Sequence, residues 1–343
     1  MSWQRIRGHD DVVSAFTRAV ERGRLAHAYL FAGLAGVGKR LFAGELAKAL
    51  LCESTNNGRL EACDACAGCR LVEAESHPDF FTAARPPDSP NLPIELMREL
   101  CRGFSLKSAR GKGKVAVLDD ADDLDDPITG NAAANCFLKT LEEPPPRSVF
   151  ILVGSSLDRQ LPTIQSRCQI VRFRPLADEA VEAILRQRGV SEKRIPELVR
   201  LSSGSPGQAL ALADEALWKF RRTLLQAFAA LRFDSVALAK QWWAFVEEAG
   251  KESALQRSRA ALALRLLVEL LDDALRISVG QPARVTEPDE LHVIQSLAQR
   301  AGPERLLAML ERCLDGDAYI DRRVQLVLVL EALLDALGQR LRQ

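Results

Sequence analysis

Apolar positions change their spacing along this chain, and the changes predict where the architecture changes. Four short apolar runs of strand length alternate with stretches of helical spacing, and they lie at 28–32, 115–118, 149–153 and 170–173. Strands that alternate with helices are typical of a parallel sheet covered by helices on both faces. The first part of the chain is therefore predicted to be an α/β domain.

The strand signal fades after residue 173. A helical stretch over about 178–203 ends at the turn GSPG, and from 208 onward Leu, Ala and Arg recur with helical periodicity. A chain of 343 residues also exceeds the size at which one hydrophobic core stops growing. We expect an α/β domain over 1–173, a small helical domain over 174–208 and an all-helical domain over 209–343.

A glycine-rich loop joins the first predicted strand to a helix over 39–51. The loop reads GLAGVGKR from 33 to 40, so Gly33, Gly36, Gly38 and Lys39 match a phosphate-binding loop. In that motif backbone N–H groups surround phosphate oxygens, the lysine reaches the β- and γ-phosphates, and a final Ser or Thr ligates Mg²⁺. Arg40 stands in that last position. Because a guanidinium has no lone pair for a metal, we expect a nucleotide site poorly equipped for hydrolysis.

Composition narrows the classes of function. The chain has 46 basic and 46 acidic residues, which argues against a protein whose affinity for DNA comes from a strongly basic surface. No run of about 18 apolar residues occurs, and the first residues lack the apolar stretch of a signal peptide. We therefore expect a cytoplasmic protein without a membrane partner.

Four of the eight cysteines form a spaced cluster. Cys63, Cys66 and Cys69 follow C-x2-C-x2-C spacing, and Cys52 lies shortly before them. Four thiolates suit tetrahedral zinc and leave no open position for a substrate, which is typical of a structural site. An iron–sulfur cluster and unligated thiols remain alternatives, although the fourth Cys and the Pro that usually continue the iron–sulfur triplet are absent after Cys69.

Two charged stretches border the second predicted strand. Asp119 and Asp120 end the apolar stretch KVAVL, where phosphate-loop ATPases carry an acid that binds Mg²⁺. The acidic residues that follow, including Asp122, are interpreted as a solvated turn. Before the strand, a set of basic residues is interpreted mainly as a flexible solvated loop, with contact to DNA phosphates as the alternative: Lys107, Arg110, Lys112 and Lys114.

Several motifs, taken together, resemble one family over roughly the first 210 residues. They are HAYLFAGLAGVGK at 27–39, the cysteine cluster, HPDFF at 77–81, KVAVLDDAD at 114–122, NAAANCFLKTLEEPPP at 131–146 and LPTIQSRC at 161–168. This combination resembles the bacterial clamp-loader subunits of the AAA+ class. The resemblance implies an AAA+ phosphate-loop domain with a zinc module over 52–69, a helical lid, and an all-helical collar through which subunits assemble.

Within that family the chain resembles the non-motor subunit type and not the ATP-hydrolysing tau/gamma motor. The motor type would have Thr at Arg40, Glu at Asp120, and a phosphate-sensing Arg at Gly207. The resemblance therefore implies a subunit of the DNA polymerase III holoenzyme that has no polymerase site and has lost its ATPase. Binding of ATP or ADP stays open, with Asp119 as part of a vestigial site.

The resemblance also implies a catalytic role outside the chain's own site. The arginine of the SRC triplet, Arg167, would act in trans as an arginine finger in the ATP site of a neighbouring motor subunit. The implied partners are tau/gamma and delta subunits in a hetero-pentameric ring, the polymerase holoenzyme, and primer–template DNA reached through the complex. Such a finger stabilises charge on the transferred phosphoryl group.

Two other readings are kept beside this one. The first is a tau/gamma-like AAA+ ATPase that tolerates Arg40 and holds Mg²⁺ mainly through Asp119. The second is a zinc-stabilised DNA-binding module, which the balanced charge disfavours. An apparent insertion at 126–130, relative to the family, has no assigned role.

Overall fold

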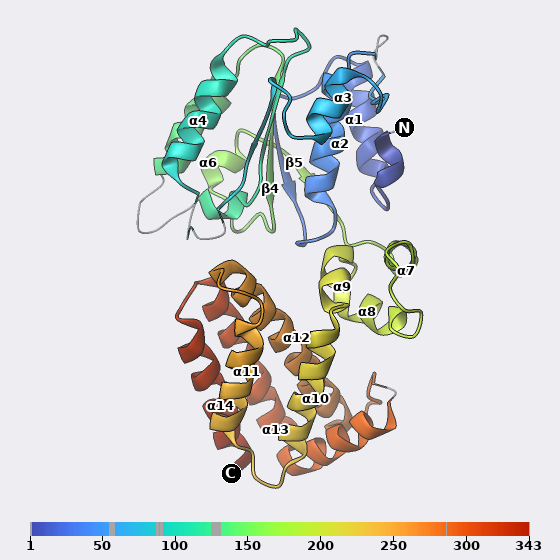
Figure 1. Ribbon diagram of the computed structural model, residues 1–343, viewed down its shortest axis with the longest axis vertical. Helices are drawn as coiled ribbons and strands as arrows, with labels where there is room; N and C mark the ends of the chain where they lie inside the picture. The colour runs from blue at the N-terminus through green and yellow to red at the C-terminus, as the bar shows by residue number, and fades with distance from the viewer. Residues whose placement is uncertain are drawn as a thin grey trace. The chain divides into compact units, whose positions relative to one another are not determined.

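The computed structural model describes residues 2–54, 59–86, 89, 92–124, 132–285 and 287–342. The insertion at 126–130 therefore lies outside the described residues. The chain divides into two compact units, Met1–Leu210 and Ala211–Gln343, which are described separately (Figure 1). The division into three domains stays a prediction.

The first unit contains a five-stranded sheet in which every recorded pairing is parallel. Its order is β2-β3-β4-β1-β5. The strands are β1 (Ala28–Ala32), β2 (Phe80–Ala83), β3 (Lys114–Leu118), β4 (Ser148–Gly154) and β5 (Gln169–Arg172). The four predicted strands are confirmed to within one residue at each end. We did not predict β2, because four residues with a half-buried centre give too short an apolar run.

Helices cover both faces of this sheet. On one face, α1 (Asp10–Glu21) and α2 (Lys39–Leu51) contribute Phe16 and Phe42 to an aromatic cluster with Phe31 of β1 and Phe173. On this side of the sheet Figure 1 also shows α3 (Ala67–Glu73) beside α2. The short helix η1 (Ser2–Arg5) contacts α2 as well. Aromatic rings bury large apolar areas, so this cluster fastens the two helices to the sheet.

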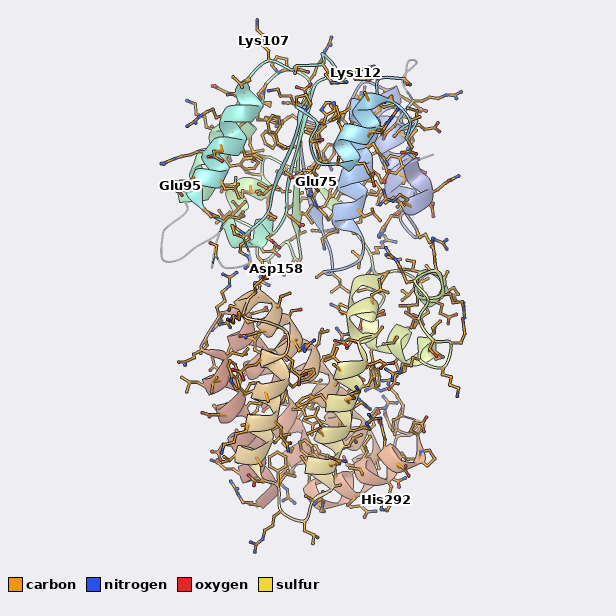
Figure 2. All side chains as sticks on the ribbon, in the orientation of Figure 1. Glu75, Glu95, Lys107, Lys112, Asp158 and His292 are labelled. Carbon is orange, nitrogen blue, oxygen red and sulfur yellow. The ribbon has the colours of Figure 1, made fainter. Side chains whose placement is uncertain are left out.

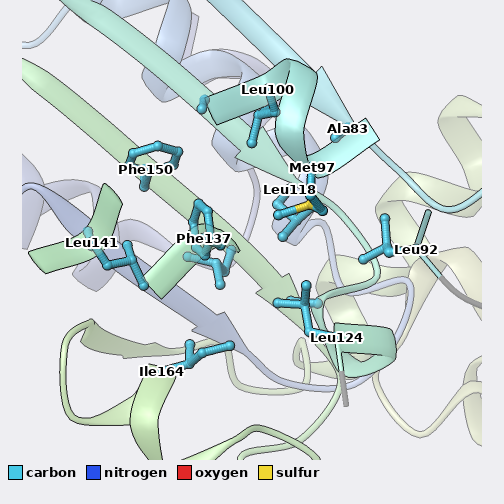
Figure 3. Close-up of a cluster of buried hydrophobic side chains, with 14 of the residues drawn as sticks. Ala83, Leu92, Met97, Leu100, Leu118, Leu124, Phe137, Leu141, Phe150 and Ile164 are labelled. Carbon is cyan, nitrogen blue, oxygen red and sulfur yellow. The ribbon is translucent and has the colours of Figure 1, made fainter. Parts of the chain in front are cut away.

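The opposite face carries the second part of the core (Figure 3). Met97 of α4 (Ile94–Ser105) and Phe137 of α5 (Ala132–Glu142) pack with Leu118 of β3 and Phe150 of β4. The short segments η2 (Ala121–Leu124) and α6 (Pro162–Gln165) close this layer through Leu124 and Ile164. The predicted parallel sheet with helices on both faces is therefore confirmed.

Three short helices follow the sheet: α7 (Asp178–Gln187), α8 (Ile195–Ser202) and α9 (Pro206–Leu212). The second unit is all-helical, with α10 (Glu215–Ala229), α11 (Ser235–Glu247), α12 (Ser253–Ser278), α13 (Pro288–Asp321) and α14 (Leu326–Arg342). Its core includes the fully buried Trp242, and α13 is interrupted at Gly302. Among the described residues, no helix has both the length and the apolar character that a membrane span requires.

Candidate functional site

The loop that matches the phosphate-binding motif, called the phosphate loop below, lies between β1 and α2, as the sequence pattern predicts. Gly38 caps the N-terminus of α2 with a left-handed φ of 103°, a conformation that residues with a Cβ rarely adopt. The backbone N–H groups of the loop therefore lie at the N-terminus of α2, where the helix dipole favours anions.

Lys39 is turned toward the carbonyls of its own loop. The residue is buried, and its ammonium group donates hydrogen bonds to the carbonyl oxygens of Gly33 at 2.5 Å and Leu34 at 2.7 Å. Burial lowers the pKa of Lys39, an effect that the carboxylates of Asp122 and Asp119 partly oppose. The lysine thus has partners within the chain, and a phosphate would have to compete with them.

Arg40 lies between two carboxylates. Its Nη2 donates a hydrogen bond to Glu75 Oε1 at 2.9 Å, and its Nε lies 3.9 Å from Asp119 Oδ2. Burial raises the pKa of Asp119, the charge of Asp120 adds to this, and Arg40 acts in the opposite direction. A permanent cation therefore faces the acid that would hold Mg²⁺ in a working ATPase. Glu75, labelled in Figure 2, was not expected to take part in this site.

The start of α9 and the serine before it are attached directly to the phosphate loop. Ser205 Oγ donates to the carbonyl oxygen of Ala35 at 2.7 Å, and the Gly207 N–H donates to the carbonyl oxygen of Gly36 at 3.0 Å. A Cβ at Gly207 would lie only 2.7 Å from Gly36 Cα. The position where the motor type has its sensing arginine therefore touches backbone and has no room for a side chain.

The interpretation of Asp122 as part of a solvated turn is wrong. Its Oδ2 accepts a hydrogen bond from the Ser155 N–H at 2.8 Å, and its Oδ1 accepts a short one from Gln160 Nε2. The carboxylate ties η2, which follows β3, to the segment that follows β4. Because these partners are 33 and 38 residues away, the local charge pattern could not reveal them.

The four clustered cysteines converge on one point. Their sulfur atoms all lie within 4.8 Å of one another, and the Cys52–Cys66 and Cys63–Cys69 pairs are each 3.9 Å apart. A tetrahedron of sulfurs about 2.3 Å from a metal has edges of about 3.8 Å, so the separations fit a tetrahedral ion. All four cysteines are free of disulfides. The cluster can therefore bind a metal ion.

Backbone amides surround the same sulfurs. The N–H groups of Cys66 and Cys69 each lie 3.3 Å from the sulfur three residues earlier in the chain. Hydrogen bonds, first from the Ala65 N–H, lower the pKa of Cys63 to about 6, whereas burial raises the pKa of Cys69. Bound metal favours thiolates, so ligation would outweigh the effect of burial on Cys69.

Ion pairs join the cysteine module to α2. Lys48 of α2, itself buried, lies 2.8 Å from Asp64 Oδ1, 3.0 Å from Glu45 Oε2 and 3.2 Å from Glu73 Oε2. Arg5 completes the set by pairing with Glu73 at 2.7 Å and Glu45 at 3.1 Å. Because α2 also begins at the phosphate loop, the module braces the helix on which Lys39 and Arg40 lie.

Arg167 lies on the segment between α6 and β5 and is about one-third exposed. Its Nε donates to Glu142 Oε1 at 3.0 Å, its Nη2 makes a shorter hydrogen bond to the same oxygen, and its Nη1 donates to the Thr163 carbonyl at 3.1 Å. The sequence did not single out Glu142. Its place at the end of a helix followed by three prolines was the available signal.

The basic residues before β3 do not act as one group. Lys107 and Lys112 are exposed (Figure 2), whereas Lys114 is buried and donates from Nζ to the Gly103 carbonyl at 2.7 Å. Lys114 is therefore excluded from contact with DNA phosphates.

The connecting loop is also anchored. Asp79 accepts hydrogen bonds from the N–H groups of Ala109 at 2.7 Å and Arg110 at 2.9 Å. Burial alone would raise the pKa of Asp79, but these N–H donors outweigh it and the pKa is lowered. Asp79 therefore attaches the loop at Ala109 and Arg110, and the flexibility of the loop stays a prediction.

Known proteins resemble both parts of the chain. Residues 8–177 match the family described as DNA polymerase III, delta subunit, and residues 215–337 match DNA polymerase III, delta subunit, C terminal. DNA polymerase III subunit delta' of Escherichia coli is 35% identical over 291 residues, which are 84% of this chain and 81% of that protein. The corresponding protein of Pseudomonas aeruginosa is 31% identical over 91% of this chain and 92% of its own length.

More distant similarity extends to other proteins. DNA polymerase III subunit tau of E. coli is 32% identical over 61% of this chain, which corresponds to 32% of that protein. A solved structure of a DNA polymerase III gamma subunit-related protein from Thermotoga maritima covers 97% of this chain and 99% of its own, with 16% identity and a TM-score of 0.43.

The contact between Gly207 and Gly36 can be tested by adding one methyl group. We expect Gly207→Ala to lower the free energy of unfolding by about 1–3 kcal/mol, because the new Cβ strikes backbone. Gly44→Ala in α2 is the matched control, since a Cβ there meets nothing within 4 Å and should stabilise the helix by about 0.5–1 kcal/mol. Urea unfolding followed by circular dichroism measures both; equal effects at the two positions would contradict the close approach.

Proposed function

Because the chain belongs to the family of DNA polymerase III delta' subunits, we propose that it acts as the non-motor member of the clamp-loader ring and supplies Arg167 to a neighbouring ATP site. Membership rests on the similarity of both units to this family. The observation that carries the finer proposal is the placement of Arg40 against Asp119 in the chain's own site. Arg167, by contrast, is partly exposed at the surface.

Three features support the absence of hydrolysis in the chain's own site. Arg40 brings a guanidinium to Asp119, where a hydroxyl and Mg²⁺ would be needed. Asp120 has a shorter side chain than the Glu of the motor type. Gly207 leaves no space for a sensing arginine. Gly33, Gly36, Gly38, Lys39 and Asp119 are accordingly proposed as a vestigial nucleotide site.

The role of Arg167 follows from what hydrolysis next door requires. Charge develops on the transferred phosphoryl group, and an arginine from an adjacent subunit stabilises it without any chemistry in its own chain. Arg167 is held at the surface of the first unit on a short segment between α6 and β5. This placement supports a side chain that reaches a neighbour, with tau/gamma motor subunits as the proposed partners.

The second unit supports a scaffolding role. We assign Ala211–Gln343, an all-helical unit, to the collar through which the ring of tau/gamma, delta and delta' subunits assembles. Several of its large apolar side chains are exposed, including Leu307, Leu314 and Leu328. Primer–template DNA and the polymerase holoenzyme are proposed to be reached through this assembly.

The metal at the four cysteines is proposed to be zinc, with Cys52, Cys63, Cys66 and Cys69 as its ligands. Tetrahedral all-sulfur coordination without an open position is typical of structural zinc. A bound ion would stabilise the module that braces α2, and it would take no part in a reaction.

A tau/gamma-like ATPase is the second candidate, because Lys39 and the loop glycines are intact and the first part of the chain resembles a tau subunit. Purified alone, the chain is expected to hydrolyse ATP negligibly with or without primed DNA, because Arg40 occupies the neighbourhood of Asp119. A coupled assay for ADP measures this. Turnover near 1 s⁻¹, within the ordinary range of enzymes, would favour the ATPase over the scaffold.

The finger role is tested in the reconstituted clamp loader. Arg167→Ala should lower hydrolysis at the neighbouring motor site by about 10³-fold or more, because transition-state charge loses its partner. Clamp loading should slow as well, and the complex should keep its size in gel filtration. Arg174→Ala, a nearby exposed arginine, is the control and should change neither. Undiminished hydrolysis at that site in the Arg167 variant would refute the role.

Metal content tests the zinc proposal. Elemental analysis of the purified chain should find one zinc per molecule, and Cys66→Ser should lose it because three thiolates no longer complete the tetrahedron. Cys101→Ser, at a cysteine outside the cluster, should retain the metal. Finding iron, or no metal in the unaltered chain, would contradict zinc.

A further inference from the structure

Arg167 has no free hydrogen-bonding edge. A guanidinium offers two edges that can grip an anion with a pair of parallel N–H groups. The Nε and Nη2 edge is used by Glu142 Oε1, and Nη1 donates to the Thr163 carbonyl at 3.1 Å and to Ser166 Oγ at 3.3 Å. The arrangement engages every nitrogen of the side chain, so a pair of parallel N–H groups can grip a phosphate only if at least one of these partners is given up.

The main competing acceptor is fixed in place. Glu142 is the last residue of α5, and the preceding Leu141 is buried while its carbonyl oxygen contacts His27 Nε2 at 3.1 Å. A helix C-terminus carries partial negative charge, which reinforces the attraction of a carboxylate for a cation. The backbone that carries Glu142 is therefore held in place, so the carboxylate stays within reach of Arg167.

The Arg167–Glu142 ion pair is weak enough for Arg167 to exchange Glu142 for another anion. Both side chains are partly exposed, Arg167 by 34% and Glu142 by 51%, and exposed ion pairs contribute little to stability. A triphosphate carries more charge than a carboxylate and offers several oxygens to the same edge. Contact with a neighbour's nucleotide can therefore displace Glu142, whereas an empty site leaves the arginine paired.

We propose that Glu142 is a positioning residue that holds Arg167 retracted until the triphosphate of the neighbouring subunit takes its place. The proposal rests on the finger role of Arg167 proposed above. The exchange moves no proton and breaks no covalent bond; the guanidinium trades one anionic partner for another. Glu142 thus sets how readily Arg167 contacts the triphosphate of the neighbouring subunit. It thereby affects how hydrolysis in that subunit depends on bound nucleotide.

The test compares variants in the reconstituted clamp loader. Glu142→Gln keeps the size of the side chain and removes its charge, so kcat for ATP at the neighbouring site should rise about twofold to fivefold at low salt. The gain should shrink toward unity as salt is raised, because screening weakens the pair in the unaltered protein. Glu143→Gln, an equally charged exposed neighbour, is the matched control and should leave kcat unchanged.

A double variant separates failure of this inference from failure of the finger role. On an Arg167→Ala background, Glu142→Gln should have no effect, because the pair is already lost. If Arg167→Ala alone leaves hydrolysis unchanged, the finger role fails. The finger role stands and the retraction by Glu142 is overturned if Arg167→Ala lowers hydrolysis while Glu142→Gln leaves kcat unchanged or reduced. The same conclusion follows if the effect of Glu142→Gln persists on the Arg167→Ala background or at high salt.

Discussion

The approach of Arg40 to Asp119 is the contact on which the functional interpretation of this molecule depends. A phosphate-loop ATPase needs a small hydroxyl at this place that ligates a divalent ion. The guanidinium of Arg40 is instead part of the chain, so its positive charge cannot leave the site as a bound ion can. Glu75 pairs with the same guanidinium. The glycines and Lys39 of the loop are kept, and Arg40 forms an internal ion pair with Glu75 beside Asp119.

Two further contacts make the loop part of the framework. The Gly207 N–H and the Ser205 hydroxyl donate hydrogen bonds to the carbonyls of Gly36 and Ala35, so the start of α9 lies against the loop. On the far end of α2, Lys48 is buried among the acidic residues Glu45, Asp64 and Glu73. Removing one partner from a buried pair typically costs about 3–5 kcal/mol, against about 0–1 kcal/mol for an exposed pair. This contrast marks the buried Lys48–Glu45 pair as structural and the exposed Arg167–Glu142 pair as one that can exchange.

Much of the site could be predicted because its signals are local. The phosphate loop, the strand and helix that flank it, and the cysteine spacing each lie within a short stretch whose geometry follows from residue type. The signals that failed are those whose partners are distant. The acidic pattern around Asp122 predicts a solvated turn, but the carboxylate accepts hydrogen bonds from Ser155 and Gln160. The basic pattern around Lys114 predicts an exposed side chain, but Lys114 is buried in β3, where it contacts Gly103 and Phe81.

The sequence by itself determined four of the five strands, the glycine-rich loop with Arg40 in its last position and the cysteine set, because apolar periodicity and short-range spacing control them. It also identified Arg167 through a resemblance. Only the tertiary structure decided what these residues face: Glu75 and Asp119 around Arg40, Gly36 against Gly207, and Glu142 on Arg167. Each of these pairs joins residues between 25 and 171 positions apart, so their distances depend on how the sheet and its helices pack, which no local pattern encodes.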